Sequence, residues 1–451
     1  MRSIVVKLGS SSVTRATGPD PVVLTSALDA ALNARSMGWS VTLVTSGAIS
    51  SGAAYLARAS DVRPSGRLAA AVGQPFLMEI YRSVSEISGK QVCQILISED
   101  DLRSPGAVSS VCAVLSECAD AGIVPIVNGN DVTDMRGSDN DAVAVAIAVA
   151  SGADKLLLLT DVCGVRGEPH GNAPHLPDLP ASRIRSVRIT GSGTGRGGMR
   201  SKLRAVELAA HNGIESHIAD ARRPGVITGC IKDEPVGTRI PPARPRFPAD
   251  ARWISGVAVS HGLIVINRAA EESIGAGASL FASGIKKVDG TFSGGDVIEV
   301  LAPSGRLIAR GASKVSATLM NLVRAMQTDE IAIVLTEILS KFLRGNPGGK
   351  AGGRAPGELP RAGLAVGDLA QRDTGELRPP VIRALDFVGR CRYELTRRLA
   401  LEIINLFPAA TVEAMLDVRR DEGLHRLRDR YSSLSSDFSF IDRRRLVTFP
   451  G

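Results

Sequence analysis

Residues 156–162 read LLLLTDV, and this stretch decides the fold of the first half of the chain. A strand with one buried face alternates apolar and polar residues, whereas a strand that begins with four leucines is covered on both faces. Similar apolar runs lie at 4–6, 41–44, 92–97 and 123–127, separated by stretches with helical spacing such as 22–37 and 66–88. Apolar strands that alternate with helices predict an α/β/α sandwich around a central, mainly parallel sheet.

The composition of the sequence changes near residue 240 and again near residue 327. We predict a first domain, a Pro-rich linker and a small β-rich, barrel-like domain with short strands and Gly turns, at 1–240, 241–252 and 253–326. The tail at 327–451 is predicted to hold a Gly/Pro/Arg-rich linker and two helical segments, at 344–380, 381–407 and 422–430.

Composition indicates a globular protein, with 44% hydrophobic and 22% charged residues among 451. The net charge of +8 lies mostly in residues 331–451, which hold 20 Lys and Arg against 15 Asp and Glu. Six scattered cysteines lack the spacing of a zinc site and are typical of reduced thiols. The longest apolar run, 142–150, is far shorter than the ~18–20 residues of a membrane span. We therefore expect a cytoplasmic protein that does not cross a membrane.

Two strand ends have the character of phosphate sites. Lys7 follows a strand in VVKLGSSS, and Ser46-Gly47 follows another in VTSGAISSG. In parallel sheets, ligands bind beyond the carboxyl ends of strands, and helix N-termini there favour anions. A surface lysine and an ordinary strand–helix turn are the plainer interpretations. The P-loop sequence GxxxxGK[ST] does not occur.

A polar cluster and a glycine-rich loop add to this edge. Seven carboxylate or amide side chains fall within fourteen residues, namely Asn128, Asn130, Asp131, Asp134, Asp139, Asn140 and Asp141. Some are expected to cap helices or form Asx turns, but the cluster also suits an amino group and can orient lysines around a phosphate. Thr160-Asp161 ends another strand, and TGSGTGRGGMRSK at 190–202 is either a phosphate-wrapping loop or a plain flexible one.

Taken in order, these motifs resemble the amino acid kinase family, and within it the branch that phosphorylates glutamate. The resemblance rests on VVKLGSSSVT, VTLVTSGAIS, LAAAVGQ, GIVPIVNGNDV, GSDNDAVAVAIA, GADKLLLLTDVCGV, GTGRGGMRSKL and RPGVITG. The later segment GIKKVDGTFSGGDVIEV resembles the PUA domain that follows the kinase domain in many bacterial members. Together the likeness covers roughly residues 1–326.

The resemblance implies transfer of the γ-phosphoryl group of ATP to the side-chain carboxylate of L-glutamate. The products are γ-glutamyl phosphate and ADP, in the first step of proline biosynthesis. It implies catalytic roles for Lys7, Lys202 and Asp141, with the lysines flanking the phosphoryl group and Asp141 holding both ammonium groups. Substrate-binding positions are Ser46, Asp131 and Asn140. Nucleotide-binding positions are Lys7, Thr160, Asp161, Arg196, Gly197, Gly198, Met199, Arg200, Ser201 and Lys202.

The resemblance also implies Mg²⁺ held largely by ATP and water, with no metal site built from protein side chains. It implies a homo-oligomer, either a dimer or a tetramer, and a reductase that consumes the acyl phosphate.

The sequence departs from the family at several positions. Asn128-Gly129-Asn130-Asp131 stands where the family has Asn-Glu-Asn-Asp, the 131–139 loop is shorter, and Arg196 adds a cation. A relative acting on another glutamate-like acid therefore stays open. An RNA-binding regulatory role is a further alternative, although 253–326 holds only seven Lys and Arg against five Asp and Glu. Nucleic acid is thus not the expected partner.

Overall fold

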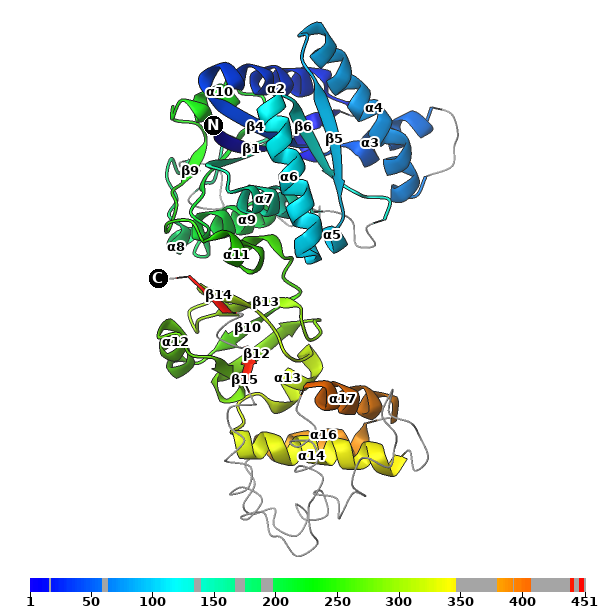
Figure 1. The fold of residues 1–451 in the computed structure, drawn as a ribbon, viewed down its shortest axis with the longest axis vertical. Helices are drawn as coiled ribbons and strands as arrows, with labels where there is room; N and C mark the ends of the chain where they lie inside the picture. The colour runs from blue at the N-terminus through cyan, green and yellow to red at the C-terminus, as the bar shows by residue number, and fades with distance from the viewer. Residues whose placement is uncertain are drawn as a thin grey trace, which may run out of the picture. The chain divides into compact units, whose positions relative to one another are not determined.

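The computed structural model describes residues 1–15, 18–58, 64–133, 139–166, 175–187, 198–345, 379–391, 393–406, 439–441 and 446–449 (Figure 1). The chain divides into two compact units, Met1–Val259 and Ser260–Gly451. Each unit has its own sheet and its own hydrophobic core.

The first unit is built on a seven-stranded sheet. Its order is β5 (Val92–Ile97), β6 (Val124–Gly129), β4 (Trp39–Val44), β1 (Arg2–Leu8), β7 (Lys155–Thr160), β8 (Glu215–Asp220) and β9 (Thr238–Ile240). All neighbouring strands are parallel except β9, which runs antiparallel to β8. The predicted mainly parallel sheet is confirmed.

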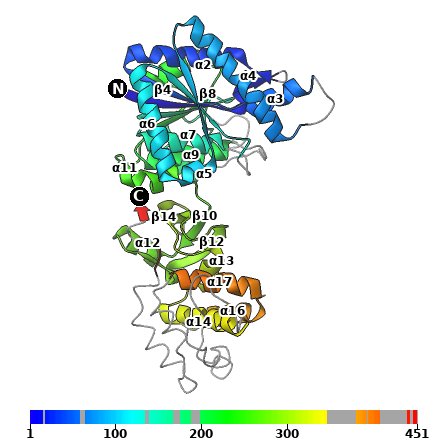
Figure 2. The same cartoon turned by 45° about the vertical axis from the view of Figure 1, so that its right-hand side comes forward.

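Helices cover both faces of this sheet. Figures 1 and 2 show α2 (Pro21–Ala34) on one side and α7 (Asn140–Ser151) and α9 (Met199–His211) on the other. Side chains of β7 alternate between the layers, because successive residues of a strand point to opposite faces. Leu157 and Leu159 pack in the core with α2, whereas Leu156 and Leu158 pack in the core with α7 and α9. An all-apolar strand is therefore what a two-sided sheet requires.

The α3 helix (Ala48–Leu56) and the α4 helix (Gly66–Ile87) cross at very short range. A Cβ atom added at Gly52 would lie 1.8 Å from the Ala69 carbonyl oxygen, and one added at Gly73 would lie 1.9 Å from the Ala48 carbonyl oxygen. Such distances are impossible for a real side chain, so only glycine permits this contact. The contact fixes α4 against the start of α3.

The boundary between the units differs from the expected linker at 241–252. Residues Ala249–Arg252 form α11, and Trp253–Val257 form a π-helical turn that belongs to the first unit. Trp253 donates through Nε1 to the Leu102 carbonyl at 3.0 Å, and Val257 lies in a hydrophobic core of the first unit. The second unit therefore begins at Ser260, later than the expected residue 253.

The second unit contains a five-stranded sheet in the order β12 (Ile285–Gly290), β10 (Gly262–Ile266), β13 (Val297–Leu301), β14 (Leu307–Ala312) and β16 (Leu446–Thr448). A two-stranded sheet joins β11 (Leu280–Phe281) to β15 (Ser439–Ile441). The last two strands come from the tail and pair with strands that lie far earlier in the sequence. We had not expected strands there.

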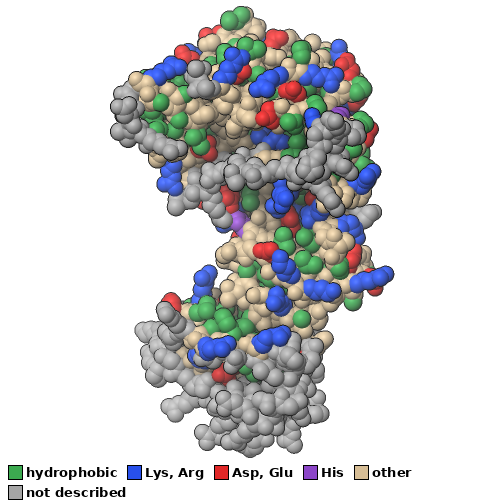
Figure 3. Space-filling model, turned by 180° about the vertical axis from the view of Figure 1, so that it is seen from behind, with side chains coloured by type: hydrophobic (Ala, Val, Ile, Leu, Met, Phe, Trp, Pro, Cys, Tyr) green, Lys and Arg blue, Asp and Glu red, His purple; other side chains and the backbone are tan. Residues whose placement is uncertain are grey.

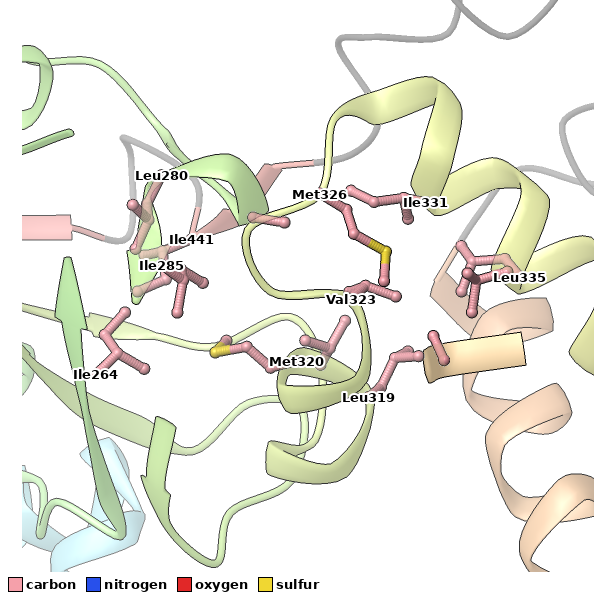
Figure 4. Packing of buried hydrophobic residues seen from close by; sticks show 14 of the residues in the cluster. Ile264, Leu280, Ile285, Leu319, Met320, Val323, Met326, Ile331, Leu335 and Ile441 are labelled. Atoms are coloured by element: carbon pink, nitrogen blue, oxygen red, sulfur yellow. The ribbon is translucent and has the colours of Figure 1, made fainter. Parts of the chain in front are cut away.

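The tail helices share one core with the strands of the second unit. They are α14 (Thr328–Gly345), α16 (Pro379–Arg390) and α17 (Tyr393–Leu406). Figure 4 shows Val323 of α13 (Ala317–Val323) between Ile331 and Leu335 of α14 and the strand-side residues Ile285 and Ile441. The tail is thus an integral part of the second unit.

The tail prediction needs two corrections. The single helix expected at 381–407 is two helices, and Lys341 Nζ donates to the carbonyls of Val388 (2.7 Å) and Cys391 (3.0 Å) at the end of the first one. The linker expected at 344–380 overlaps the ends of α14 and α16, and its remainder lies outside the described residues. The expected helix at 422–430 also lies outside them.

Candidate active site

Two lysines share one carboxylate at the carboxyl edge of the first sheet. Lys7 Nζ lies 2.6 Å from Asp141 Oδ1, and Lys202 Nζ lies 3.3 Å from Asp141 Oδ2. Asp141 is 0% exposed and the two lysines are 3% and 4% exposed. Two buried lysines that contact one carboxylate, at the edge where strand and helix ends favour anions, suit the site to an incoming anion.

Local structure explains why these three residues meet. Lys7 lies near the end of β1, between β4 and β7, and Asp141 lies in the first turn of α7. Asp139 caps this helix by accepting from the Asp141 N–H through Oδ1 (2.9 Å), and its Oδ2 accepts from Ser201 Oγ (2.8 Å). Asp139 therefore ties the first turn of α9, which carries Lys202, to the start of α7.

The environment lowers the pKa of Lys202 below its usual value. Burial favours the neutral amine and is the largest cause, and the neighbouring Lys7 ammonium acts in the same direction. Asp141 opposes both by stabilising the charged form. The lysine is thus held in a site that favours loss of its proton more than water does.

A chain of amides lies beside the lysines. Asn140 Nδ2 donates to Ser46 Oγ and to Asn128 Oδ1, both at 3.0 Å, and Asn140 Oδ1 accepts from the Gly129 N–H at 3.1 Å. Asn128 Nδ2 in turn donates to Gln74 Oε1 at 2.8 Å. The structure therefore brings the predicted residues Ser46 and Asn140 together.

The position of Ser46 depends on the glycine that follows it. Gly47 has a φ of +109°, a left-handed conformation that side chains rarely adopt, and it precedes α3 directly. This turn places Ser46 at the start of the helix.

The third predicted substrate residue, Asp131, lies half-buried in the turn after β6, with its N–H donating to the Gly129 carbonyl at 3.0 Å.

The predicted nucleotide residues fall on two segments. Thr160 is buried at the end of β7 and donates through Oγ1 to Asp161 Oδ1 at 3.1 Å. Gly198 is the N-cap of α9, and the first turn of that helix contains the predicted residues Met199, Arg200, Ser201 and Lys202. Arg196 and Gly197 lie outside the described residues.

Three members of the site were missing from the predicted set. Asn128 and Asp139 stood in the polar cluster of the sequence, where capping was a sufficient explanation. Gln74 is a single polar residue inside LAAAVGQ, an apolar helical stretch whose spacing gave no sign of contact with β6. It reaches the amide chain through a contact between residues 54 positions apart in the sequence.

The residues of this site suit a metal ion that is bound mainly by a ligand and not by protein side chains. Both oxygens of Asp141 contact lysines, and the described residues contain no group of three or more His, Cys, Asp or Glu arranged to hold a metal. Mg²⁺ commonly binds through one or two carboxylates plus substrate phosphates and water. The residues here suit a magnesium ion bound mainly by phosphate oxygens and water.

On the face shown in Figure 3, Lys and Arg side chains lie on both units, with Asp and Glu among them. In the part of the chain that is described, no helix has the length and apolar character to cross a bilayer. All six cysteines are unpaired, although Cys93 Sγ and Cys118 Sγ lie 3.4 Å apart.

A two-sided parallel sheet with paired buried lysines at its carboxyl edge defines a phosphoryl-transfer enzyme of the α/β class. Comparison with known proteins agrees. The amino acid kinase family matches residues 2–220, and the PUA domain matches residues 262–335. The chain belongs to the amino acid kinase family and groups with its glutamate 5-kinases.

Several curated relatives are named glutamate 5-kinase. A glutamate 5-kinase of Trichlorobacter lovleyi is 31% identical over 349 residues, covering 74% of this chain and 93% of the relative. Those of Vibrio vulnificus and Photobacterium profundum are 33% and 35% identical, each covering 74% of this chain and 92% of the relative. The similarity therefore leaves about a quarter of this chain uncovered.

Proposed function

We propose that this protein transfers the γ-phosphoryl group of ATP to the side-chain carboxylate of L-glutamate, giving γ-glutamyl phosphate and ADP. The observation that carries the proposal is the Lys7–Asp141–Lys202 cluster beside the Ser46–Asn140 pair. The first suits a transferring phosphoryl group and the second suits a small polar acceptor. Membership in a family whose relatives are named glutamate 5-kinases supports the choice of acceptor.

The reaction needs positioning and charge more than covalent help. A glutamate carboxylate oxygen forms a bond to the γ-phosphorus, the bond from that phosphorus to the bridging oxygen breaks, and ADP leaves with the electron pair. Because the nucleophile is already an anion, no base has to remove a proton. Lys7 and Lys202 offset the negative charge on the equatorial oxygens, and Asp141 keeps both ammonium groups in place.

The remaining roles follow from position. Ser46 and Asn140 bind polar groups of the amino acid, and the Asp131 carboxylate suits its ammonium group. The nucleotide lies along Thr160, Asp161 and the first turn of α9, together with the preceding Arg196 and Gly197. Mg²⁺ bound to the phosphates would reduce their charge further. We infer that the protein acts in the cytoplasm as a homo-oligomer and that a reductase consumes its reactive product.

The test is turnover with a panel of acidic amino acids. Purified protein, ATP and Mg²⁺ should release ADP only when L-glutamate is added, and hydroxylamine should trap the acyl phosphate as a hydroxamate. Aspartate, glutamine and 2-aminoadipate are the comparison acceptors. Turnover with another acid but not glutamate would replace the substrate and keep the chemistry. No turnover with any acid would refute the proposed function.

A further inference from the structure

Two cysteines of the first unit lie in contact, although 25 positions separate them in the sequence. Cys93 is the second residue of β5, and Cys118 lies in the last turn of α6 (Pro105–Ala121). Their Sγ atoms are 3.4 Å apart. Both thiols are free, and the proposed phosphoryl transfer uses neither of them.

The sheet and the helix that covers it bring the two side chains together. Cys93 lies on the same face of β5 as Ile95 and Ile97, because every second residue of a strand points the same way. Leu115 of α6 shares a hydrophobic core with Ile97, and Cys118 follows one helical turn later on the same side of the helix. The face of α6 that packs on the sheet therefore places Cys118 against Cys93.

Backbone hydrogen bonds keep the two residues close together. The Cys118 carbonyl accepts from the Ile123 N–H at 2.9 Å and from the Gly122 N–H at the end of α6. Gly122 has a φ of +75°, so the chain turns there and enters β6. In the sheet, Cys93 is in register with Pro125 of β6. One short turn thus connects the helix position of Cys118 to the strand that pairs with Cys93.

The surroundings of the pair suit slow oxidation. β5 is the edge strand of the sheet and Cys93 is half-buried, so a small oxidant reaches this thiol, whereas Cys118 is only 5% exposed. Burial and the neighbouring Cys118 raise the pKa of Cys93 to about 12, so little thiolate is present at neutral pH and its reaction is slow. A thiol of high pKa is also a poor leaving group, so a disulfide formed here is attacked slowly.

We propose that Cys93 and Cys118 are a reversible disulfide site, which braces the edge strand β5 against α6 under oxidising conditions. With a small disulfide as the oxidant, Cys93 first forms a mixed disulfide, and Cys118 then displaces the bound small thiol. The two protein thiols are oxidised to one S–S bond, the S–S bond of the oxidant breaks, and its two sulfurs leave as thiols with the two hydrogens. Rotation of the side chains has to bring the sulfurs closer by about 1.4 Å, to the roughly 2.05 Å of a disulfide.

Oxidised glutathione is the probe for this linkage. The full-length protein, free of reductant, is incubated with it, the remaining thiols are alkylated, and tryptic peptides are analysed by mass spectrometry. Cys93 lies in peptide 91–103, whereas Cys118 shares peptide 104–136 with Cys112. The two peptides should be found linked in the wild type and in Cys112→Ser, but not in Cys118→Ser. Dithiothreitol should separate them.

Cys163 provides an internal standard in the same sample, because it is exposed and should take up glutathione as a mixed disulfide. A wild type in which Cys163 has reacted while Cys93 and Cys118 remain unlinked would overturn the inference.

The bracing is tested by urea unfolding. A bond between residues 25 positions apart restricts the unfolded chain, so the linked protein should have a higher urea midpoint than the reduced protein. Cys118→Ser is the matched control, and its midpoint should be the same with and without oxidised glutathione. A linked wild type with an unchanged or lower midpoint would contradict the bracing role. Neither measurement depends on turnover, so the result is separate from the outcome for the proposed function.

Discussion

Lys7 Nζ lies 2.6 Å from Asp141 Oδ1, and both side chains are buried. The lysine comes from the sheet and the carboxylate from the start of α7, so this ion pair joins the two elements that meet at the candidate site. The other oxygen of the same carboxylate holds Lys202 from α9. One carboxylate thus sets the spacing of two cations, and the predictions for activity depend on it.

Activity should fall at alkaline pH when Lys202 loses its proton, and the fall should come at a lower pH than lysines ordinarily need to lose theirs. Its pKa is lowered chiefly by burial and also by Lys7. In the free enzyme the ammonium therefore loses its proton at a lower pH than an exposed lysine, and kcat/KM should fall as the pH rises through that value. The check is a pH profile of kcat/KM for the wild type and Lys202→Arg. A guanidinium does not titrate in this range, so any activity that the variant keeps should not show this fall at alkaline pH. Coincident profiles would exclude Lys202 as the titrating group.

Gly73→Ala should destabilise the first unit. The new methyl group would meet the Ala48 carbonyl oxygen, so α4 must move away from α3 at a cost of about 1–3 kcal/mol or more. Urea unfolding followed by circular dichroism measures the change. Gly66→Ala in the same helix is the control, because nothing lies within 4 Å of the added atom. The control should be neutral or slightly stabilising. Equal behaviour of the two variants would refute the close crossing.

His217 should stabilise the fold at neutral pH and lose this effect in alkali. Burial favours the neutral ring, but hydrogen bonding to Cys230 and Glu215 outweighs it and raises the pKa to about 9. A raised pKa in the folded state means that the contribution is complete below the unfolded value near 6.5 and disappears as the pH rises through about 9. The free energy of unfolding of the wild type should exceed that of His217→Gln at pH 6, and the difference should shrink at alkaline pH. A difference independent of pH would contradict a charged His217.

Ile441→Ala should weaken the second unit although this residue lies in the last part of the tail. Ile441 is 0% exposed and belongs to the core that the strands share with the tail helices. Truncating a buried isoleucine costs about 2–5 kcal/mol. Ile87→Ala, the same change at a residue that is 89% exposed, is the control. If chemical unfolding shows no difference between the two variants, the tail is not part of the core.

The first unit was largely predictable because its signals are local. Four leucines in a row before Thr160 show a strand buried on both faces, and Lys7 and Lys202 lie at strand and helix ends where phosphate sites form. The meeting of these lysines on Asp141 was implied by the family resemblance, and the structure places all three in contact.

Long-range contacts were not predictable in this way. Gln74 of α4 contacts Asn128 of β6, and α4 crosses α3 at two glycines, but neither contact has a sequence signature of its own. The pairing of β15 and β16 with earlier strands of the second unit was also missed, since three-residue strands are too short to show a period. Composition described the tail as an appendage, but its helices bury residues in the same core as the strands.

The most direct test of the central claim is glutamate-dependent ADP release by the wild type, Asp141→Asn and Asp29→Asn. The last is a control, because Asp29 is exposed on α2. Asparagine at 141 keeps the shape but removes the charge of the one carboxylate that contacts both buried ammonium groups. We expect wild-type turnover from the control and a loss of about a hundredfold or more in kcat for Asp141→Asn, with the circular dichroism spectrum unchanged. A folded Asp141→Asn protein that turns over glutamate at the wild-type rate would contradict the account.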